Sequence, residues 1–348
     1  MRQFHKPSSG PSGKELSEDV AIRERVFSEG KPGLLVIDDG EVSGVCLNCP
    51  DTPCVFYSES EIFSPVLDDF PFNRSRDVCP YSAISVDNAN LLPVIDDRSC
   101  VGCGICVARC PANALYVNSR GTVSVSDGEN RAIKCRSSRD EASHKRSIHS
   151  LSKSVKSGHL RKVDLPTLER VINDIVNSGT NNTAQKLLVR NLIMAIGGEA
   201  AISSVGDTNV RIDMWWAHSG LLWVTEVDFD IVSLVDSPRG LLDDVAVCVS
   251  RHGVAKDSIR AMIVCLEFPN KRSDYYHIVE DVKSILNIEI CTVSVAGLLL
   301  AMWTHRTLGD IDFANCVALR GSETVAGGFR SITDSPSILR SRYFSATK

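Results

Sequence analysis

The sequence predicts two unlike domains: an α+β domain built around cysteines, followed by an α/β domain with a mixed sheet flanked by helices. Three observations predict this division. Eight of the 13 cysteines fall between residues 46 and 110 in two spaced sets. A basic, serine-rich stretch covers residues 131–163. Beyond residue 164, apolar residues at helical spacing alternate with strand-like apolar runs, a pattern typical of a sheet covered by helices.

The clearer cysteine set has the spacing C-x2-C-x2-C-x3-C-P, formed by Cys100, Cys103, Cys106 and Cys110. The looser set comprises Cys46, Cys49, Cys54 and, after a long insertion, Cys79. The compact run resembles that of bacterial ferredoxins with two [4Fe-4S] clusters. The resemblance implies a ferredoxin-like dicluster domain over residues 34–130, with residues 1–33 as a flexible segment before it.

In those ferredoxins the last cysteine of a run binds the cluster of the other run. The resemblance therefore implies that cluster I is held by Cys46, Cys49, Cys54 and Cys110. It implies that cluster II is held by Cys79, Cys100, Cys103 and Cys106. An internal repeat supports the crossing, because CPYSAISV from Cys79 matches CPANALYV from Cys110 at the Cys, Pro, Ala and Val positions.

The looser set departs from the ferredoxin pattern, because four residues separate Cys49 from Cys54. Zinc and disulfides are the alternatives. Zinc favours paired C-x2-C motifs or mixed Cys/His ligands, and disulfides fit an intracellular chain poorly. Three further cysteines, Cys248, Cys265 and Cys291, lie in apolar segments and are expected in the core.

Charge is unevenly distributed along the chain. Residues 36–99 contain twelve acidic and three basic residues, a net charge of −9 that would suit a basic redox partner protein. No apolar run reaches the ~18 residues that span a membrane, and the first residues show no apolar leader. We therefore expect a soluble, cytoplasmic protein without a membrane partner.

The basic stretch has the opposite charge. Residues 131–162 contain ten basic and two acidic residues, a net charge of +8. The first interpretation is a solvated linker over residues 131–163. The second is an arm that contacts the phosphates of DNA or RNA, since such contacts supply most non-specific affinity. The candidate nucleic-acid contacts are Lys145, Arg146, Lys153 and Lys156.

The second domain is expected over residues 164–308, and residues 309–348 are expected to form a mobile or partner-bound tail. Helices are predicted near residues 164–179, 183–196, 241–252, 274–286 and 295–304. Strands are predicted at residues 209–217, 221–229, 260–266 and 288–293. The first two strands form a hairpin around His218, Ser219 and Gly220, with its tryptophans packed in the core or on the sheet face.

Three acidic residues lie on this hairpin. Asp213 falls on the first strand, and Glu226 and Asp228 lie two residues apart on the second, so they share a face of the sheet. Carboxylates that converge at a sheet edge can bind Mg²⁺ through oxygen. The bland alternative is that these acids are exposed residues of an ordinary amphipathic hairpin.

The order of elements and acids over residues 182–300 resembles the PD-(D/E)xK, or restriction-endonuclease-like, superfamily. The resemblance implies a metal-dependent nuclease fold with Asp213, Glu226 and Asp228 as candidate catalytic residues. Asp228 stands where that superfamily has its lysine, so catalysis is either lost or served by another cation such as Lys256.

These features predict an iron–sulfur protein whose clusters are coupled to a nuclease-like, nucleic-acid-associated domain of the defence or repair type. The alternative is a ferredoxin-type electron carrier or redox subunit whose second domain docks a partner. A third possibility is a degenerate nuclease fold used only for binding or assembly.

Overall fold

The structure is a computed structural model that describes residues 46, 49, 51–62, 72–87, 92–126, 161–179, 181–204 and 212–347. In its N-terminal part, β1 (Ile84–Val86) pairs with β2 (Pro93–Ile95), and β3 (Leu115–Val117) pairs with β4 (Val123–Val125). Both pairs are antiparallel. Two short helices, α2 (Glu59–Ile62) and α3 (Ile105–Arg109), complete this part of the fold. Such short elements leave most of the backbone in loops.

The C-terminal part is built on a five-stranded sheet, in the order β5-β6-β7-β8-β9. Its strands are β5 (Glu199–Ile202), β6 (Met214–His218), β7 (Leu221–Val227), β8 (Ile259–Cys265) and β9 (Ile290–Ser294). The first three strands are antiparallel, and β7, β8 and β9 run parallel. The predicted mixed sheet is confirmed. Strand β5 was not predicted, because Glu199–Ile202 is short and contains two alanines.

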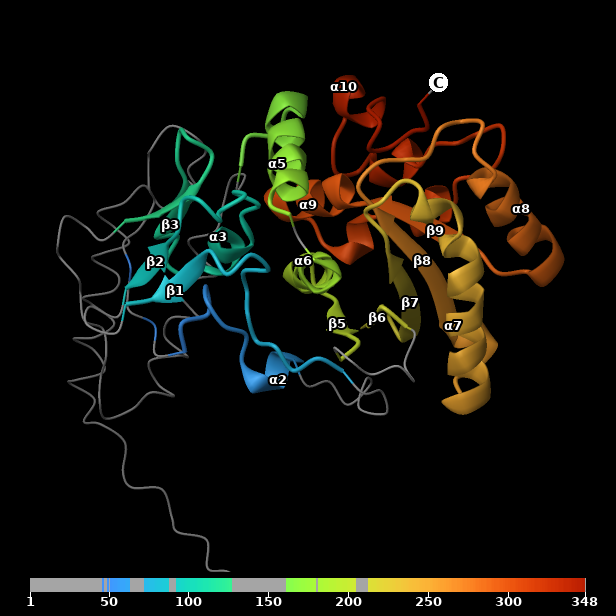
Figure 1. Ribbon diagram of the computed structural model, residues 1–348, viewed down its shortest axis with the longest axis horizontal. Coiled ribbons are helices and arrows are strands. Elements are labelled where there is room, and N and C mark those ends of the chain that lie inside the picture. The colour runs from blue at the N-terminus through green and yellow to red at the C-terminus, as the bar shows by residue number, and fades with distance from the viewer. Residues whose placement is uncertain are drawn as a thin grey trace, which may run out of the picture.

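Helices connect and cover this sheet (Figure 1). They are α5 (Leu165–Asn177), α6 (Asn182–Ala195), α7 (Ser237–Arg251), α8 (Tyr275–Leu286) and α9 (Val295–Trp303). Asp164 caps α5 by accepting from the Thr167 amide at 2.9 Å, and Asn181 caps α6 by accepting from the Ala184 amide at 2.9 Å. These caps explain why both helices begin where the sequence predicted.

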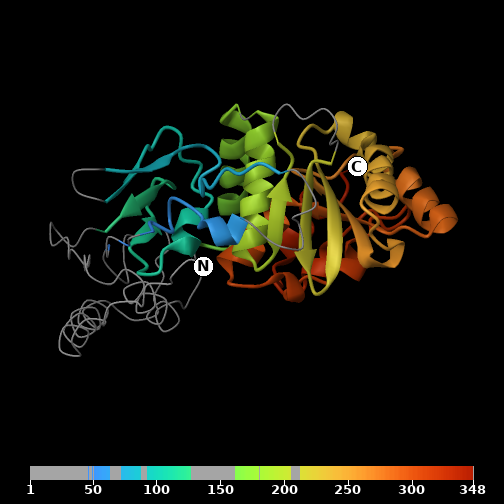
Figure 2. The same cartoon turned by 90° about the horizontal axis from the view of Figure 1, so that it is seen from below.

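Figure 2 shows α5 and α6 between the N-terminal part and the sheet, with α7 and α8 on the distant side. Both α6 and α9 contact α3 of the N-terminal part. None of the helices in the described ranges is long and apolar enough to cross a membrane.

The tryptophans of the hairpin are core residues. Trp215 and Trp216 are fully buried, and the ring of Trp216 stacks on that of Trp223 at 4.6 Å between centroids. Phe313 packs on Trp223 at the same centroid distance. The aromatic residues of the hairpin therefore stabilise the sheet and are not available to stack on bases.

The C-terminal segment differs from the expected mobile tail. Five of its aromatic or branched aliphatic side chains are completely buried: Val325, Phe329, Ile338, Tyr343 and Phe344. The Phe268 amide donates to the Arg342 carbonyl at 2.9 Å, and the Lys271 amide donates to the Thr347 carbonyl at 2.9 Å. The glycine- and serine-rich composition of this segment predicted a tail, because its apolar residues are too widely spaced to form a recognisable pattern. These apolar residues pack on the second domain.

Side chains of α6 bind the backbone of the N-terminal part. Arg190, which is fully buried, donates to the Ser75 carbonyl at 2.8 Å. The side-chain amide of Asn191 donates to the carbonyls of Asp77 and Val78, both at 2.9 Å. Since Val78 precedes Cys79, α6 fixes the path of a cysteine-bearing loop.

This contact predicts that the two parts stabilise each other. Asn191→Leu leaves the Val78 carbonyl without this donor and the Asp77 carbonyl with only the longer bond from Arg190 at 3.4 Å, at a cost of about 1–3 kcal/mol in the free energy of unfolding. Asn173→Leu, at an exposed position of α5, should change stability by less than about 0.5 kcal/mol. Denaturant unfolding followed by circular dichroism measures both, and equal midpoints for the two variants would contradict the assignment.

Candidate functional site

The structure brings together the four cysteines predicted to hold cluster I. They line one cavity with apolar neighbours that include Val55, Val86 and Leu115; the cysteines are Cys46, Cys49, Cys54 and Cys110. Burial raises the pKa of the Cys49 thiol well above its usual value, and the nearby Cys110, Cys54 and Cys46 raise it further. A late cysteine of the compact run thus lies among the cysteines of the looser set.

The other four cysteines form a second group. Burial raises the pKa of the Cys106 thiol, and the next contributions come from Cys103, Cys79 and Cys100. Burial, followed by the proximity of Cys79, raises the pKa of the Cys103 thiol to about 12. Helix α3 separates the two groups, since Cys106 lies within it and Cys110 caps its C-terminal end.

Backbone amides point at several of these sulfur atoms. The Ala83 amide donates to Cys79 Sγ at 3.3 Å, and the Ala114 amide donates to Cys110 Sγ at 3.2 Å. Both bonds span four residues, and each encloses a residue with positive φ: Ser82 at 53° in one loop and Asn113 at 51° in the other. The sequence repeat is thus also a repeat of conformation.

These donor sets fit an iron–sulfur cluster. Buried thiols release their protons only when a positive charge compensates the thiolates, and iron supplies that charge when bound. Amide hydrogen bonds to sulfur are one of the means by which proteins tune such clusters. In the described ranges no three His, Cys, Asp or Glu side chains are close enough together to hold a single metal ion. The twelve described cysteines are all free thiols.

In the second domain, Asp213 lies immediately before β6 and pairs with a lysine that the sequence analysis missed. Its Oδ1 forms an ion pair with Lys186 Nζ of α6, and its Oδ2 accepts a hydrogen bond from the Val227 backbone amide at 3.1 Å. The two side chains of the ion pair are only 15% and 12% exposed. Helical periodicity alone could not reveal this pairing, because Lys186 precedes the hairpin by more than twenty residues.

Glu226 of β7 faces the same group. Its pKa is raised to about 8 by burial and then by the neighbouring carboxylates of Asp213 and Asp244, while Lys186 opposes this shift. Burial also raises the pKa of Asp213, against the opposing effect of the Lys186 ammonium. We call the group of Asp213, Glu226 and Lys186 the acidic site. Its ionisable side chains are largely shielded from water.

Asp228 lies near the same group, since its charge contributes to the raised pKa of both Asp213 and Glu226. Its carboxylate accepts from Ser233 Oγ at 2.7 Å and from Ser237 Oγ at 3.0 Å, at and just before the start of α7. The binding of one ion by all three acids stays a prediction, and in the structure two hydroxyl groups hold the Asp228 carboxylate. Asp213 and Glu226 do converge, and Lys186 supplies the cation beside them.

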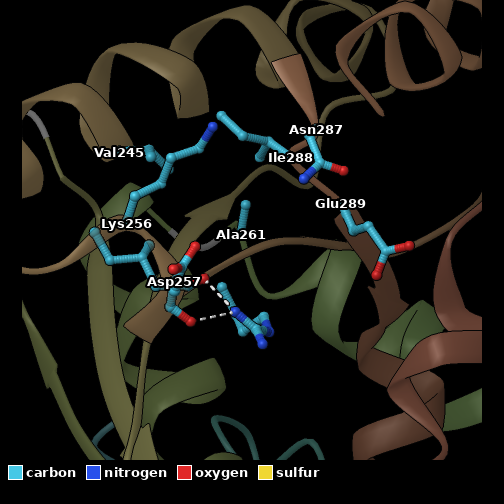
Figure 3. A pocket seen from close by; sticks show the side chains of 9 residues that line it. Val245, Lys256, Asp257, Ala261, Asn287, Ile288 and Glu289 are labelled. Carbon is cyan, nitrogen blue, oxygen red and sulfur yellow. Dashed lines mark hydrogen bonds between the residues drawn. The ribbon is translucent and has the colours of Figure 1, made fainter. Parts of the chain in front are cut away.

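Lys256 does not take the place of the missing lysine. The register pairs Leu222 with Ile259 and Glu226 with Ile263, so Lys256 lies beyond the opposite end of β8 from the acidic site. Lys256 Nζ donates to the Leu286 carbonyl at 3.0 Å. Figure 3 shows it in a separate pocket, with Asn287 and Glu289 on another side of that pocket.

The proposed nucleic-acid contacts Lys145, Arg146, Lys153 and Lys156 lie outside the described residues. Arg161, at the end of the same basic stretch, is described and is fully buried against the cysteine-bearing loops. The linker prediction missed this residue, because a basic, serine-rich composition does not distinguish a solvated arginine from a buried one.

Residues 93–116, which contain the compact cysteine run, match the family described as "4Fe-4S binding domain". The segment of the N-terminal part that bears the compact cysteine run is therefore similar to 4Fe-4S binding domains. The chain is 30% identical over 125 residues to the polyferredoxin-like subunit of an aliphatic sulfonate oxidoreductase of Pyrococcus furiosus. That match covers 36% of this chain and 56% of the relative.

A second relative is an uncharacterised ferredoxin of Methanocaldococcus jannaschii, 24% identical over 75 residues, or 22% of this chain and 34% of the relative. The chain thus covers 56% and 34% of the lengths of these two relatives. No solved structure matches the chain. The comparisons support the ferredoxin resemblance and give no support to the nuclease-like interpretation of the second domain.

The raised pKa of Glu226 predicts a pH-dependent stability. A carboxyl group whose folded pKa exceeds its unfolded value stabilises the fold below the unfolded pKa, and this contribution is lost as the pH rises through about 8. Glu226→Gln should therefore be more stable than the natural protein at pH 9, on the order of 2 kcal/mol. Near pH 4 the difference should vanish. A constant difference across this range, measured by denaturant unfolding, would contradict the assignment.

Proposed function

We propose that this protein binds two [4Fe-4S] clusters and transfers single electrons as the ferredoxin-type component of a redox assembly. The main support is the crossed grouping of the cysteines, with Cys110 among the first set and Cys79 among the second. Each group offers four thiols, as a four-iron cluster requires. A single mononuclear metal site would not explain two groups that exchange their last cysteines.

The partner in this proposal is a redox protein. The relative from Pyrococcus furiosus is named as a subunit of an oxidoreductase, which supports a subunit role for this chain. The net charge of −9 over residues 36–99 would steer a basic partner to the ferredoxin-like domain. The second domain then fixes the cysteine-bearing loops on one side and leaves the other side for the partner.

A second candidate function is a Mg²⁺-dependent nuclease, favoured by the acidic site. Asp213 and Glu226 can offer oxygen ligands to Mg²⁺, and Lys186 can stabilise the negative charge that develops at a phosphate. The order α6, β6, β7, α7, β8 follows the expectation for the restriction-endonuclease-like superfamily, with β5 as an additional strand. In this proposal Lys186 takes the role of the superfamily's lysine, whose position in the sequence Asp228 occupies. DNA or RNA is held by the basic stretch.

Iron content tests the electron-transfer proposal. Protein purified without oxygen should contain about eight irons per chain, and Cys103→Ser should retain about four because only cluster II loses a ligand. Cys248→Ser, a control at a buried cysteine of α7, should retain all of them. Iron is measured by chemical assay and the clusters by electron paramagnetic resonance after reduction. Zinc in place of iron, or about four irons in the unaltered protein, would refute the two-cluster assignment.

Cleavage assays test the second candidate. Plasmid and single-stranded DNA are incubated with Mg²⁺ or Mn²⁺ and with oxidised or reduced protein. Asp213→Ala and Lys186→Met should each lower any cleavage by at least about 100-fold, whereas Lys256→Met should not. Cleavage that survives Asp213→Ala and Glu226→Ala removes the acidic site from the mechanism. No cleavage in either redox state, with clusters that reduce reversibly, leaves electron transfer alone.

A further inference from the structure

The second domain contains a cavity that neither proposed function uses. Its volume is about 420 Å³, which falls within the roughly 300–1,000 Å³ that small-molecule sites occupy. It lies beside α7, where β8 and β9 begin, and the loop after α8 forms its opposite wall. The acidic site is found toward the other end of β8, since Glu226 pairs with Ile263. The cavity is therefore a separate place with its own chemistry.

The backbone holds one cation of this cavity in place. Arg260, which lines the cavity, donates from Nη1 to the Asp257 carbonyl at 2.9 Å and to the Ile259 carbonyl at 2.8 Å (Figure 3, dashed lines). Its Nε and Nη2 groups have no hydrogen-bond partner among the described residues. The Nε–Nη2 edge of a guanidinium matches the two oxygens of a carboxylate. Arg260 is thus a fixed cation with its carboxylate-binding edge unoccupied.

Asp257 brings a negative charge to the same wall. Its side chain lines the cavity and has no ion pair within the described ranges, with Arg260 or with any other residue. Because the backbone carbonyl of Asp257 accepts from Arg260, the two opposite charges lie on neighbouring parts of the wall. Figure 3 shows Glu289 on the far side of the cavity from Asp257. One wall therefore offers a cation and an anion that do not neutralise each other.

The charged groups elsewhere in the cavity already have partners. Glu289 pairs with Lys283 at 2.8 Å, and Lys256 Nζ donates to the Leu286 carbonyl at 3.0 Å. These contacts weaken the attraction of both groups for a ligand. The charges that a ligand would meet first are those on the wall of Arg260.

The cavity also has an apolar lining. Val245 of α7 is 5% exposed, and Ile259 and Ala261 of β8 are 6% and 1% exposed. A ligand that covers these side chains with an apolar group removes that group from water, which favours binding. A simple salt ion would gain nothing from this surface.

We propose that the cavity binds a free α-amino acid with an apolar side chain. The ligand's carboxylate accepts two hydrogen bonds from Arg260, Asp257 balances its ammonium group, and its side chain packs on Val245 and Ile259. An α-amino acid bears both charges on one carbon atom, as closely spaced as the two charges of this wall. A simple anion would be repelled by Asp257 and a simple cation by Arg260. Binding changes no covalent bond and does not depend on the iron–sulfur clusters.

Isothermal titration calorimetry of the whole protein tests this inference, with L-leucine as the probe. Two analogues each lack one charge: L-leucinamide has no carboxylate, and 4-methylpentanoate has no ammonium group. L-leucine should bind at least about tenfold more tightly than either analogue, because each loses one charge-assisted contact. No binding of L-leucine, or equal affinities for the three compounds, overturns the inference. Inorganic phosphate that binds as tightly as L-leucine also overturns it, since the cavity would then be an anion site.

Matched variants connect each charge of the ligand to its residue. Arg260→Gln should lower the affinity for L-leucine at least about tenfold and leave that for L-leucinamide unchanged. Asp257→Asn, at an exposed position that folding does not require, should weaken L-leucine but not 4-methylpentanoate. Arg330→Gln, an exposed control outside the cavity, should bind like the unaltered protein. The assignment is wrong if Arg260→Gln weakens L-leucine and L-leucinamide equally, or if Asp257→Asn changes neither ligand.

Discussion

The structure depends on side chains of the second domain, and of Arg161 just before it, that donate to backbone carbonyls of the cysteine-bearing loops. Loops that surround sulfur ligands cannot pair their carbonyls in a sheet, and buried carbonyls without donors are costly. The guanidinium of Arg161 donates to the Gly102 carbonyl, and the indole of Trp303 donates to the Cys103 carbonyl. The side-chain amide of Asn191 donates to the carbonyls of Asp77 and Val78. The second domain is therefore part of the scaffold of the iron–sulfur domain and not an appended module.

Helix α6 has a place in both candidate functions. Lys186 binds Asp213 of the acidic site, while Arg190, one helical turn later, binds the Ser75 carbonyl of the N-terminal part. One helix therefore positions side chains at both places.

The comparisons and the geometry support different parts of the chain. The family match and the archaeal relatives support the iron–sulfur domain. The acidic site is supported by Lys186, whose ion pair with Asp213 is largely buried. A buried ion pair alone is weak support for catalysis, since Asp213 also accepts from the Val227 amide and thereby fixes the end of the hairpin. This is why electron transfer is the first proposal and nuclease activity the second.

Local patterns in the sequence were sufficient to predict several features. The apolar periodicity located α5 and α6, with the cap at Asp164 marking the start of α5, and the turn at Ser219 and Gly220 located the hairpin. The spacing from Cys100 to Cys110 determined the ferredoxin resemblance, because ligands close in sequence are constrained by a short loop. The internal repeat at Cys79 and Cys110 reappears in the structure as equivalent hydrogen bonds from backbone amides to the two cysteine sulfur atoms.

Long-range packing decided the rest. No local pattern shows that Lys186 meets Asp213 or that Lys256 lies beyond the far end of β8 from the acidic site. Strand β5 is too short to show a period, and the apolar residues of the C-terminal segment are too widely spaced. Arg161 lies in a segment with the composition of a linker, but its burial depends on α9 and two distant loops. Sequence determined which residues could bind iron, whereas tertiary structure decided which charges surround them, because charges interact through space.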